Sequence, residues 1–454
     1  MLRSAALAAL LGASSVLAGT KCSLSSKCPK ESPCCSQYGE CGVGAYCLGG
    51  CDPRSSFSLD ACAPAPVCKS TTTKFDSKDS IVDIGEYLGD ASKADWVAQG
   101  EPAIHDGSVL LTMPRKSVGT VLASTSYMWY GNVKAKFKTS RGRGVVTAFI
   151  LLSDVKDEID YEFVGVDLQT AQTNYYFQGI TDYHNSGNIS LSDTFHNFHE
   201  YEIRWTPDKV EWLVDGQVGR TKLRKDTWNE TSQQWMFPQT PARVQLSIWP
   251  GGLASNAKGT IDWAGGEIDW DAEDIKKAGY FYATFSEVSI ECYDAKSPPG
   301  TNHGKSYTYT STAGTNDTVK DGDKDTVMGS LLASGLDMNK GKKSSSSAST
   351  SAEKPTNTQN TIPGGGKGGG GGNDHSGDKG GSSSSGGSGG SSGNNGGSGA
   401  QPTAGGSSGC SSNSFNQDCN SGSKDGGSGG KSGSSKASAS ALAMIIAGVA
   451  LFWL

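Results

Sequence analysis

The stretch from Ser70 to Asp294 is a succession of short runs of β-branched and aromatic residues separated by turn residues. Such runs predict strands, and no long apolar pattern at helical spacing interrupts them. The expected strands are 118–123, 132–138, 145–152, 158–164, 174–178, 199–205, 209–214, 243–249 and 280–291. The stretch also holds nine of the ten tryptophans, which suits a large core. We therefore predict an all-β fold, a β-sandwich or jelly roll.

Both ends of the chain carry signals for export and anchoring. Residues 1–18 combine one early arginine, an apolar run and small final residues, as a cleaved secretory signal does. Residues 441–454 are apolar but fall short of the ~20 residues that a membrane-spanning helix needs. A short apolar tail after a polar spacer is typical of a signal for a GPI anchor, which is removed on attachment. The candidate attachment residues are Asn420 and Gly427, the latter within the small-residue stretch 426–430.

The cysteines indicate disulfides, because twelve of them occur in a chain with an export signal. Nine lie between Cys22 and Cys68, so residues 19–51 form a small module that depends on disulfides. Seven cysteines in that module leave one without a partner, and Cys62 with Cys68 is the expected local pair. The sequons at Asn188, Asn229 and Asn316 fit the same compartment as N-glycosylation sites.

Composition also sets limits on partners. Residues 305–440 are dominated by Ser, Gly, Thr and Lys, so we expect a disordered stalk there. The net charge of −6 and the lack of a basic patch argue against nucleic acid as a partner and favour an uncharged polymer. The six histidines form no zinc-binding pattern, and we expect neither a metal nor another cofactor.

The most informative motif is Asp-Glu-Ile-Asp-Tyr-Glu-Phe at residues 157–163. Side chains alternate along a strand, so Glu158, Asp160 and Glu162 share one face and the residues between them share the other. Neighbouring acids on that face are ~6.6 Å apart by backbone rise. In a cleft, their repulsion and burial keep one carboxyl protonated as a general acid while another stays ionised as a nucleophile. Cleavage of a glycosidic bond with retention needs these two roles.

A second predicted strand supplies groups that can bind sugar. Arg243, Gln245, Ser247 and Trp249 alternate onto one face, which is polar and ends in an indole. Sugar hydroxyls need hydrogen-bonding partners and the C–H face of a sugar ring stacks on an aromatic ring. An acidic solvated surface and a tryptophan at the rim of a sandwich are the alternatives for these two strands.

With these residues in view, the chain resembles glycoside hydrolase family 16, and more narrowly the fungal Crh family of cell-wall transglycosylases. The resemblance runs from Cys62 to Cys292, within a domain of residues 62–294. It rests on the motifs at 130–137, 144–153, 158–162, 248–252 and 259–265.

The resemblance implies a β-jelly-roll in which Glu158 is the nucleophile, Asp160 tunes it, and Glu162 is the acid/base and contacts substrate. It also implies Trp249 and Thr260 as sugar-contacting residues, and strand alternation adds Arg243 and Gln245. The implied reaction cleaves a β-1,4 bond of chitin, the donor, and transfers the chain to a β-1,6- or β-1,3-glucan acceptor. The implied location is the cell wall or the outer leaflet of the cell membrane, through the lipid anchor.

Residues 34–47 resemble a hevein-type chitin-binding module, whose sugar-contacting positions correspond to Ser36, Tyr38 and Tyr46. The alternative is a disulfide knot that packs on the catalytic domain. For the whole protein, a retaining endo-hydrolase of chitin or β-1,3-glucan is the alternative within enzymes. A non-catalytic wall lectin or structural mannoprotein is the alternative of another class, and the complete set of three acids argues against it.

Overall fold

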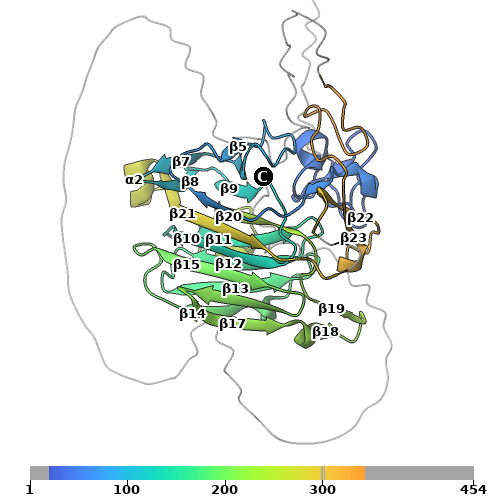
Figure 1. Ribbon diagram of the computed structural model, residues 1–454. Helices are drawn as coiled ribbons and strands as arrows, with labels where there is room; N and C mark the ends of the chain where they lie inside the picture. Colours follow the sequence, from blue (N-terminus) through green and yellow to red (C-terminus); the bar gives the residue numbers. More distant parts are fainter. Residues whose placement is uncertain (1–19, 298–299, 301, 343–454) are drawn as a thin grey trace, which may run out of the picture. The chain divides into compact units, whose positions relative to one another are not determined.

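The computed structural model describes residues 20–297, 300 and 302–342, and these form an almost entirely β structure (Figure 1). Its two large sheets pack face to face around one core to which both contribute. The two α-helices of the described residues are short: α1 (Lys258–Trp263) and α2 (Glu273–Ala278). This is the β-jelly-roll predicted from the sequence.

The first sheet carries the three predicted acids. Its eight strands, in order across the sheet, are β14 (Gly187–Ser190), β13 (Thr170–Tyr176), β12 (Glu158–Val164), β11 (Val145–Ser153), β20 (Ala242–Pro250), β9 (Thr120–Ser124), β6 (Trp96–Gln99) and β5 (Ile81–Asp83). All neighbours are antiparallel except β5 and β6, which run parallel. Strands β12, β11 and β20 therefore lie at its centre.

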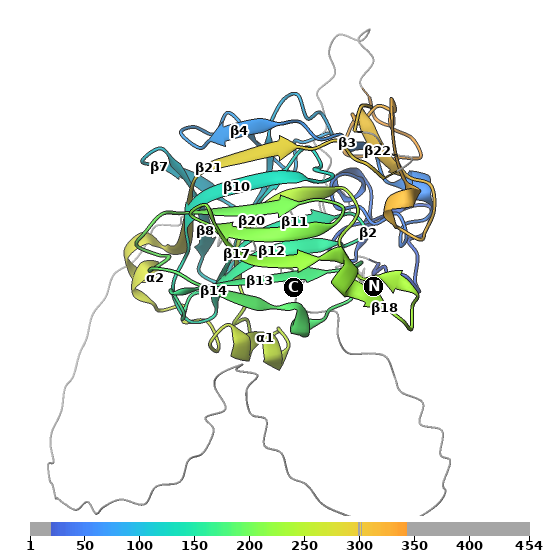
Figure 2. The same cartoon turned by 60° about the horizontal axis from the view of Figure 1, so that its bottom comes forward.

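The second sheet covers the inner side of the first. Its strands are β17 (Gln217–Leu223), β16 (Lys209–Val214), β15 (His199–Trp205), β10 (Gly131–Lys138), β21 (Tyr280–Cys292), β8 (Ser108–Pro114) and β7 (Pro102–His105), and β4 (Thr71–Lys74) also pairs with β21. Figure 2 shows this sheet from another side. Aromatic rings fill the space between the sheets; Phe137 stacks on Phe285 with ring centroids 4.5 Å apart.

The N-terminal module contains β1 (Cys34–Cys35) and β2 (Cys41–Gly42), with four disulfides: Cys22–Cys35, Cys28–Cys41, Cys34–Cys47 and Cys51–Cys62. The predicted Cys62–Cys68 pair is wrong, because Cys68 bonds to Cys292 at the end of β21. These two cysteines lie 224 residues apart, and only the folded sheet brings them together. The module therefore extends to Cys62 instead of ending at residue 51.

A three-stranded sheet pairs the segment after the N-terminal module with a segment beyond residue 305; its strands are β3 (Ala65–Pro66), β22 (Ser306–Tyr309) and β23 (Val319–Gly322). The expectation of disorder from residue 305 is therefore wrong for residues 305–342. Tyr307 is buried with its ring against Trp129, and Met328 and Ala333 pack on the module. A few well-placed apolar residues thus order a polar segment. The expected signal peptide, the rest of the stalk and the apolar tail lie outside the described residues.

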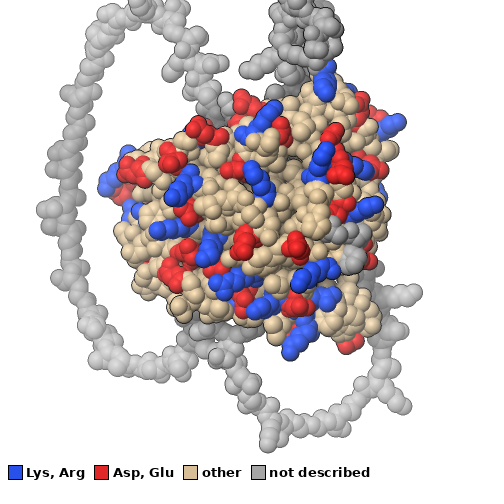
Figure 3. All heavy atoms as spheres, viewed as in Figure 1, with Lys and Arg blue, Asp and Glu red and all other residues tan. Residues whose placement is uncertain are grey.

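The remaining elements are short. They are the hairpin β18 (Trp228–Asn229) and β19 (Gln234–Trp235) and the 3₁₀ turns η1 (Gly44–Cys47), η2 (Leu59–Ala61), η3 (Tyr183–Asn185), η4 (Arg224–Thr227) and η5 (Asn316–Thr318). Among the described helices, none is long and apolar enough to cross a bilayer. On the face seen in Figure 3, basic and acidic side chains are interspersed.

Candidate active site

Strand β12 places the predicted acids on the outer face of the first sheet. Ile159, Tyr161 and Phe163 point into the core, so the three acids point the other way, as the alternation predicted. Glu158 is 4% exposed and Asp160 is 1% exposed, whereas Glu162 is half-buried. We call this outer side, with the residues that share it on neighbouring strands, the acid-bearing face.

The strand register identifies the neighbours of each acid. Along β11, Glu158, Asp160 and Glu162 lie opposite Leu152, Ile150 and Ala148. Along β13, they lie opposite Tyr176, Asn174 and Gln172. The acids therefore stand between an apolar strip on one side and polar or aromatic side chains on the other.

Burial raises the pKa of all three carboxyls. For Glu158 and Glu162 the pKa lies well above its usual value because of desolvation and then of repulsion from Asp160. Desolvation raises the pKa of Asp160 to about 7, against the opposing effects of Arg220 and a hydrogen bond from the Asn174 backbone. Carboxyls that interact this strongly share protons, so the group holds at least one proton near neutral pH.

Asp160 also has an unused hydrogen-bonding atom. Its Oδ2 is buried and has no hydrogen-bond partner among the described residues. The backbone oxygen of Asp160 accepts a hydrogen bond from the Trp212 indole N–H at 3.0 Å, which fixes the backbone at this point. A buried acceptor without a partner is costly in a resting protein, and such groups are common where a ligand or a shared proton completes the site.

Strand β20 contributes the second predicted set of residues. Through β11, Arg243, Gln245 and Ser247 lie in the same rows as Glu158, Asp160 and Glu162, respectively. The alternation predicted from the sequence is confirmed for this strand. Arg243 Nη2 and Gln245 Nε2 both donate to Gln37 Oε1 of the N-terminal module, at 3.0 and 3.1 Å. These two side chains are therefore already engaged by the module.

Trp249 lies beyond Ser247 on the same face and is buried. Its ring stacks on Trp263 of α1, with centroids 6.0 Å apart and planes at 29°. Trp263 in turn donates from Nε1 to Gln172 on β13 at 2.8 Å. Thr260 lies in the same helix and is buried, and its contact with sugar stays a prediction.

Four residues of this face were missed in the sequence: Trp263, Gln172, Asn174 and Tyr176. The signal for those on β13 was strand alternation, since Gln172, Asn174 and Tyr176 are each two residues apart. Trp263 stands inside one of the family motifs, where its indole was available as a candidate.

The three candidate residues of the chitin-binding module are buried. Ser36, Tyr38 and Tyr46 are 2%, 6% and 4% exposed. The Tyr38 hydroxyl donates to Gln99 Oε1 on β6 at 2.8 Å, and Tyr46 packs in a cluster with Met328. A sugar ring has no access to these side chains in this arrangement, so their contact with chitin stays a prediction without support here. The alternative, a disulfide knot packed on the catalytic domain, describes what the structure shows.

The sequons differ in surroundings. Asn188 is exposed on the edge strand β14, as glycosylation requires. Asn229 is half-buried, and its side-chain oxygen accepts from the backbone of Thr231. The Asn316 amide donates to Ser297 Oγ at 2.9 Å. All three stay predictions, and the proposed anchor residues Asn420 and Gly427 lie outside the described residues.

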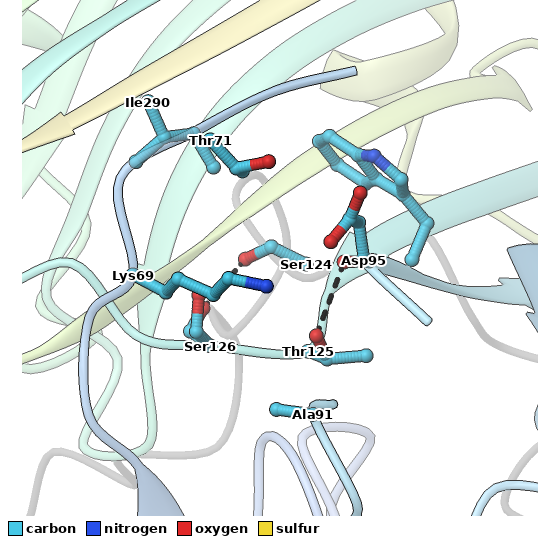
Figure 4. A pocket seen from close by; sticks show the side chains of 9 residues that line it. Lys69, Thr71, Ala91, Asp95, Ser124, Thr125, Ser126 and Ile290 are labelled. Carbon is cyan, nitrogen blue, oxygen red and sulfur yellow. Dashed lines mark hydrogen bonds between the residues drawn. The ribbon is translucent and has the colours of Figure 1, made fainter. Parts of the chain in front are cut away.

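Two small pockets occur away from the acids. One, shown in Figure 4, is lined by Lys69, Asp95 and Thr125 among others, and its threonine hydroxyl bonds to the backbone of Asp95. The other lies between the module and the jelly roll and includes Gly49 and Arg243. None of the three acids lines either pocket, so the acid-bearing face is identified by its chemistry and not by a cavity.

Comparison with known proteins agrees with this chemistry. The sequence model of the glycosyl hydrolases family 16 matches residues 90–265, which include all three acids, Trp249 and Thr260. Crh-like protein 3 of Botryotinia fuckeliana is 67% identical over 332 residues, or 73% of this chain and 75% of that protein. Crh-like protein 2 of Aspergillus fumigatus is 56% identical over 347 residues, or 75% of this chain and 78% of that protein. The solved structure of apo Crh5 transglycosylase is 30% identical, covers 57% of this chain and 95% of its own, and has a TM-score of 0.47.

An all-β jelly roll with three acids on one buried strand face defines a glycosidase of family 16. This chain belongs to that family and, within it, to the Crh-like proteins. It is therefore an enzyme that acts on glycosidic bonds, and the retaining mechanism expected from the paired carboxyls fits the family.

Proposed function

We propose that this protein is a cell-wall transglycosylase that cleaves β-1,4 bonds of chitin and transfers the released chain to β-1,6- or β-1,3-glucan. The observation that carries the proposal is the set of three acids on one face of β12, two buried and one half-buried, in a chain of the Crh-like family. Export by residues 1–18, N-glycosylation and a GPI anchor replacing residues 441–454 would place the enzyme at the wall.

In the first step, Glu162 protonates the glycosidic oxygen and Glu158 attacks the anomeric carbon, which forms a covalent glycosyl-enzyme. Glu162 suits this role because burial raises its pKa, which favours the protonated form that a general acid needs. Backbone rise alone would separate Glu158 from Glu162 by ~13 Å, so both side chains must lean toward the bond that is cleaved.

Asp160 resolves a conflict at the nucleophile. Glu158 must be ionised to attack, yet burial and its two acidic neighbours raise its pKa. If Asp160 holds the shared proton, it carries no charge and can donate a hydrogen bond, so Glu158 becomes the carboxylate. The pKa of Asp160, about 7, makes this distribution accessible near neutral pH.

In the second step, Glu162 takes a proton from the hydroxyl of the acceptor, which attacks the glycosyl-enzyme and releases Glu158. Water competes for the same intermediate. A 100-fold preference for sugar over water requires only ~2.7 kcal/mol of differential stabilisation of the transition state. Stacking of the acceptor on Trp263, the half-buried ring of the Trp249–Trp263 pair, is one source of such stabilisation.

The test is a transfer assay with the secreted protein through residue 342, which contains every described residue. The protein is incubated with chitin oligomers and a fluorescent β-glucan oligosaccharide. Large fluorescent products are expected from the wild type and from Glu101→Gln, a control at an exposed glutamate, but not from Glu158→Gln. Shortened chitin without labelled product would make the enzyme a hydrolase, and oligomer binding without any product would favour the lectin.

A further inference from the structure

The N-terminal module meets the acid-bearing face through a side-chain bridge. The Gln37 carbonyl oxygen accepts hydrogen bonds from Arg243 and Gln245 on β20. These residues lie two strands from Glu158 and Asp160, a separation of ~10 Å across the sheet. A sugar chain that crosses β12 toward β20 therefore meets Gln37.

The bridge continues across the sheet to β6. The Gln37 side chain also hydrogen-bonds the Tyr38 hydroxyl, which donates to Gln99 on β6. The contact at Arg243 is close, because a side chain on Gly49 would place its Cβ 2.3 Å from Arg243 Nη1. The module thus contacts β20 and β6, which lie on either side of β9.

A second set of contacts fixes the module to the jelly roll. The Gly50 amide donates to Tyr127 and to Asp154, both at 3.0 Å. Arg54 donates to the Val155 carbonyl at 2.8 Å and is itself paired with buried Asp52 at 3.0 Å. Buried polar networks of this kind hold one arrangement, because each broken bond leaves a desolvated group without a partner.

Residues 326–342 hold the module from its other side. The Gly44 amide donates to the Ala333 carbonyl, and the Gly335 amide donates to the Ala61 carbonyl, both at 2.8 Å. Met328 and Ala333 are buried in the same cluster as Tyr46. The module is therefore built into the catalytic unit, and its own sugar-contacting positions are used for packing.

Strand β20 offers unused hydrogen-bonding groups beside this bridge. Arg243 Nε, Ser247 Oγ and Trp249 Nε1 are buried and have no hydrogen-bond partner among the described residues. Buried polar groups are rarely left unpaired, so these atoms show that hydrogen bonding along β20 is incomplete in the free protein. These groups belong to the part of the acid-bearing face that lies on β20. The module borders the face on that side.

We propose that the N-terminal module is a fixed wall of the substrate site, and that Gln37 is a specificity-determining residue which limits how many sugar units bind on the β20 side of the acids. This inference rests on the proposed function, because it assumes that a β-linked sugar chain lies across Glu158 and Glu162.

The test uses the full secreted chain and a ladder of chitin oligomers with the fluorescent β-glucan acceptor. Gln37→Met keeps the side-chain volume but removes the hydrogen bonds to Arg243, Gln245 and Tyr38, whereas Gln37→Glu keeps an acceptor for Arg243 and Gln245. We expect Gln37→Met to transfer chains of a different length from those of the wild type, with KM for the longest oligomer changed about tenfold and kcat much less. Gln37→Glu should resemble the wild type, as should Gln217→Ala, an exposed glutamine in the other sheet.

The outcomes separate this inference from the proposed function. If Gln37→Met makes labelled products with the length distribution and KM values of the wild type, the wall is refuted and the transferase stands. If the wild type makes no product, the proposed function fails, and calorimetric binding of the same ladder then tests the wall alone. An unchanged dependence of affinity on chain length in Gln37→Met would overturn the wall in that case too. Thermal unfolding of each variant shows whether the module is still docked.

Discussion

Asp157 and Asp160 are both buried and lie three residues apart in one acidic stretch, but their surroundings are opposite. Asp157 accepts four hydrogen bonds: Oδ1 from the backbone N–H of Gln178, and Oδ2 from the backbone N–H of Gln239 and from the backbone N–H and hydroxyl of Thr240. Asp160 has one oxygen without a partner and two acidic neighbours. Asp157, which links loops, has both carboxylate oxygens hydrogen-bonded. Asp160, which lies between the two proposed catalytic glutamates, has one oxygen without a hydrogen-bond partner in the described part of the chain.

The largest effect should come from the proposed nucleophile. Glu158→Gln removes the proposed nucleophile and also one of the repelling charges, so we expect transfer to fall by at least ~10³-fold while the fold is kept. Transfer rates and thermal unfolding measured on the same preparation check both parts. A rate within tenfold of the wild type would assign the nucleophile to another residue.

Asp157→Asn should produce the reverse pattern. The amide cannot accept all four bonds, so buried donors of Gln178, Gln239 and Thr240 lose partners, at a cost of ~2–4 kcal/mol in the free energy of unfolding. Denaturant unfolding measures this loss, and the rate per folded molecule should fall far less than in Glu158→Gln. Unchanged stability would break the comparison, because the four bonds would then not hold the loops.

Asp160→Asn should change the pH dependence of the reaction. Where Asp160 is ionised, above its pKa of about 7, its charge raises the pKa of both Glu158 and Glu162, so its removal lets both ionise at lower pH. The alkaline limb of the bell-shaped profile of kcat/KM against pH is therefore expected to move to lower pH. Asp157→Asn is the matched control and should leave the profile in place; equal shifts in both variants would remove the distinction between the two acids.

The last prediction concerns stability without substrate. The pKa of Asp160 is higher in the folded protein, about 7, than its usual 3.8, so the folded state binds this proton more tightly than the unfolded state does. The contribution of Asp160 to stability is then present at low pH and is lost as pH rises from ~4 to ~7. Melting temperatures of wild type and Asp160→Asn across this range should converge at the acidic end. A constant difference would mean that Asp160 is not protonated in the folded state.

Local pattern was enough to locate the acids. The predicted strands 158–164, 199–205 and 209–214 match β12, β15 and β16 residue for residue, because alternation and turn residues define them. Residues 174–178 were a poorer prediction: β13 covers Thr170–Tyr176, since pairing with β14 extends it toward its N-terminal end. Strand β8 was missed, although it is apolar and almost fully buried between neighbours.

Long-range contacts could not be read in the same way. Nothing local indicates that Cys68 reaches Cys292, or that Gln37 reaches Arg243 and Gln245 across more than 200 residues. The ordered part of the predicted stalk depends equally on partners elsewhere in the chain, since β22 pairs with β3. The sequence therefore predicted the chemistry of the acid-bearing face but not the wall beside it.

The Cys68–Cys292 bond has a mechanical consequence. It covalently links the residues just before β4 to the end of β21, so tension that arrives at either cysteine can bypass the jelly roll between them. A pull on the chain beyond residue 342 first loads the contacts of Met328 and Ala333 with the module, and then the hydrogen bonds of β23, β22 and β3. These contacts and strand pairs would break first, and the sheet that holds the three acids would keep its strand register under tension.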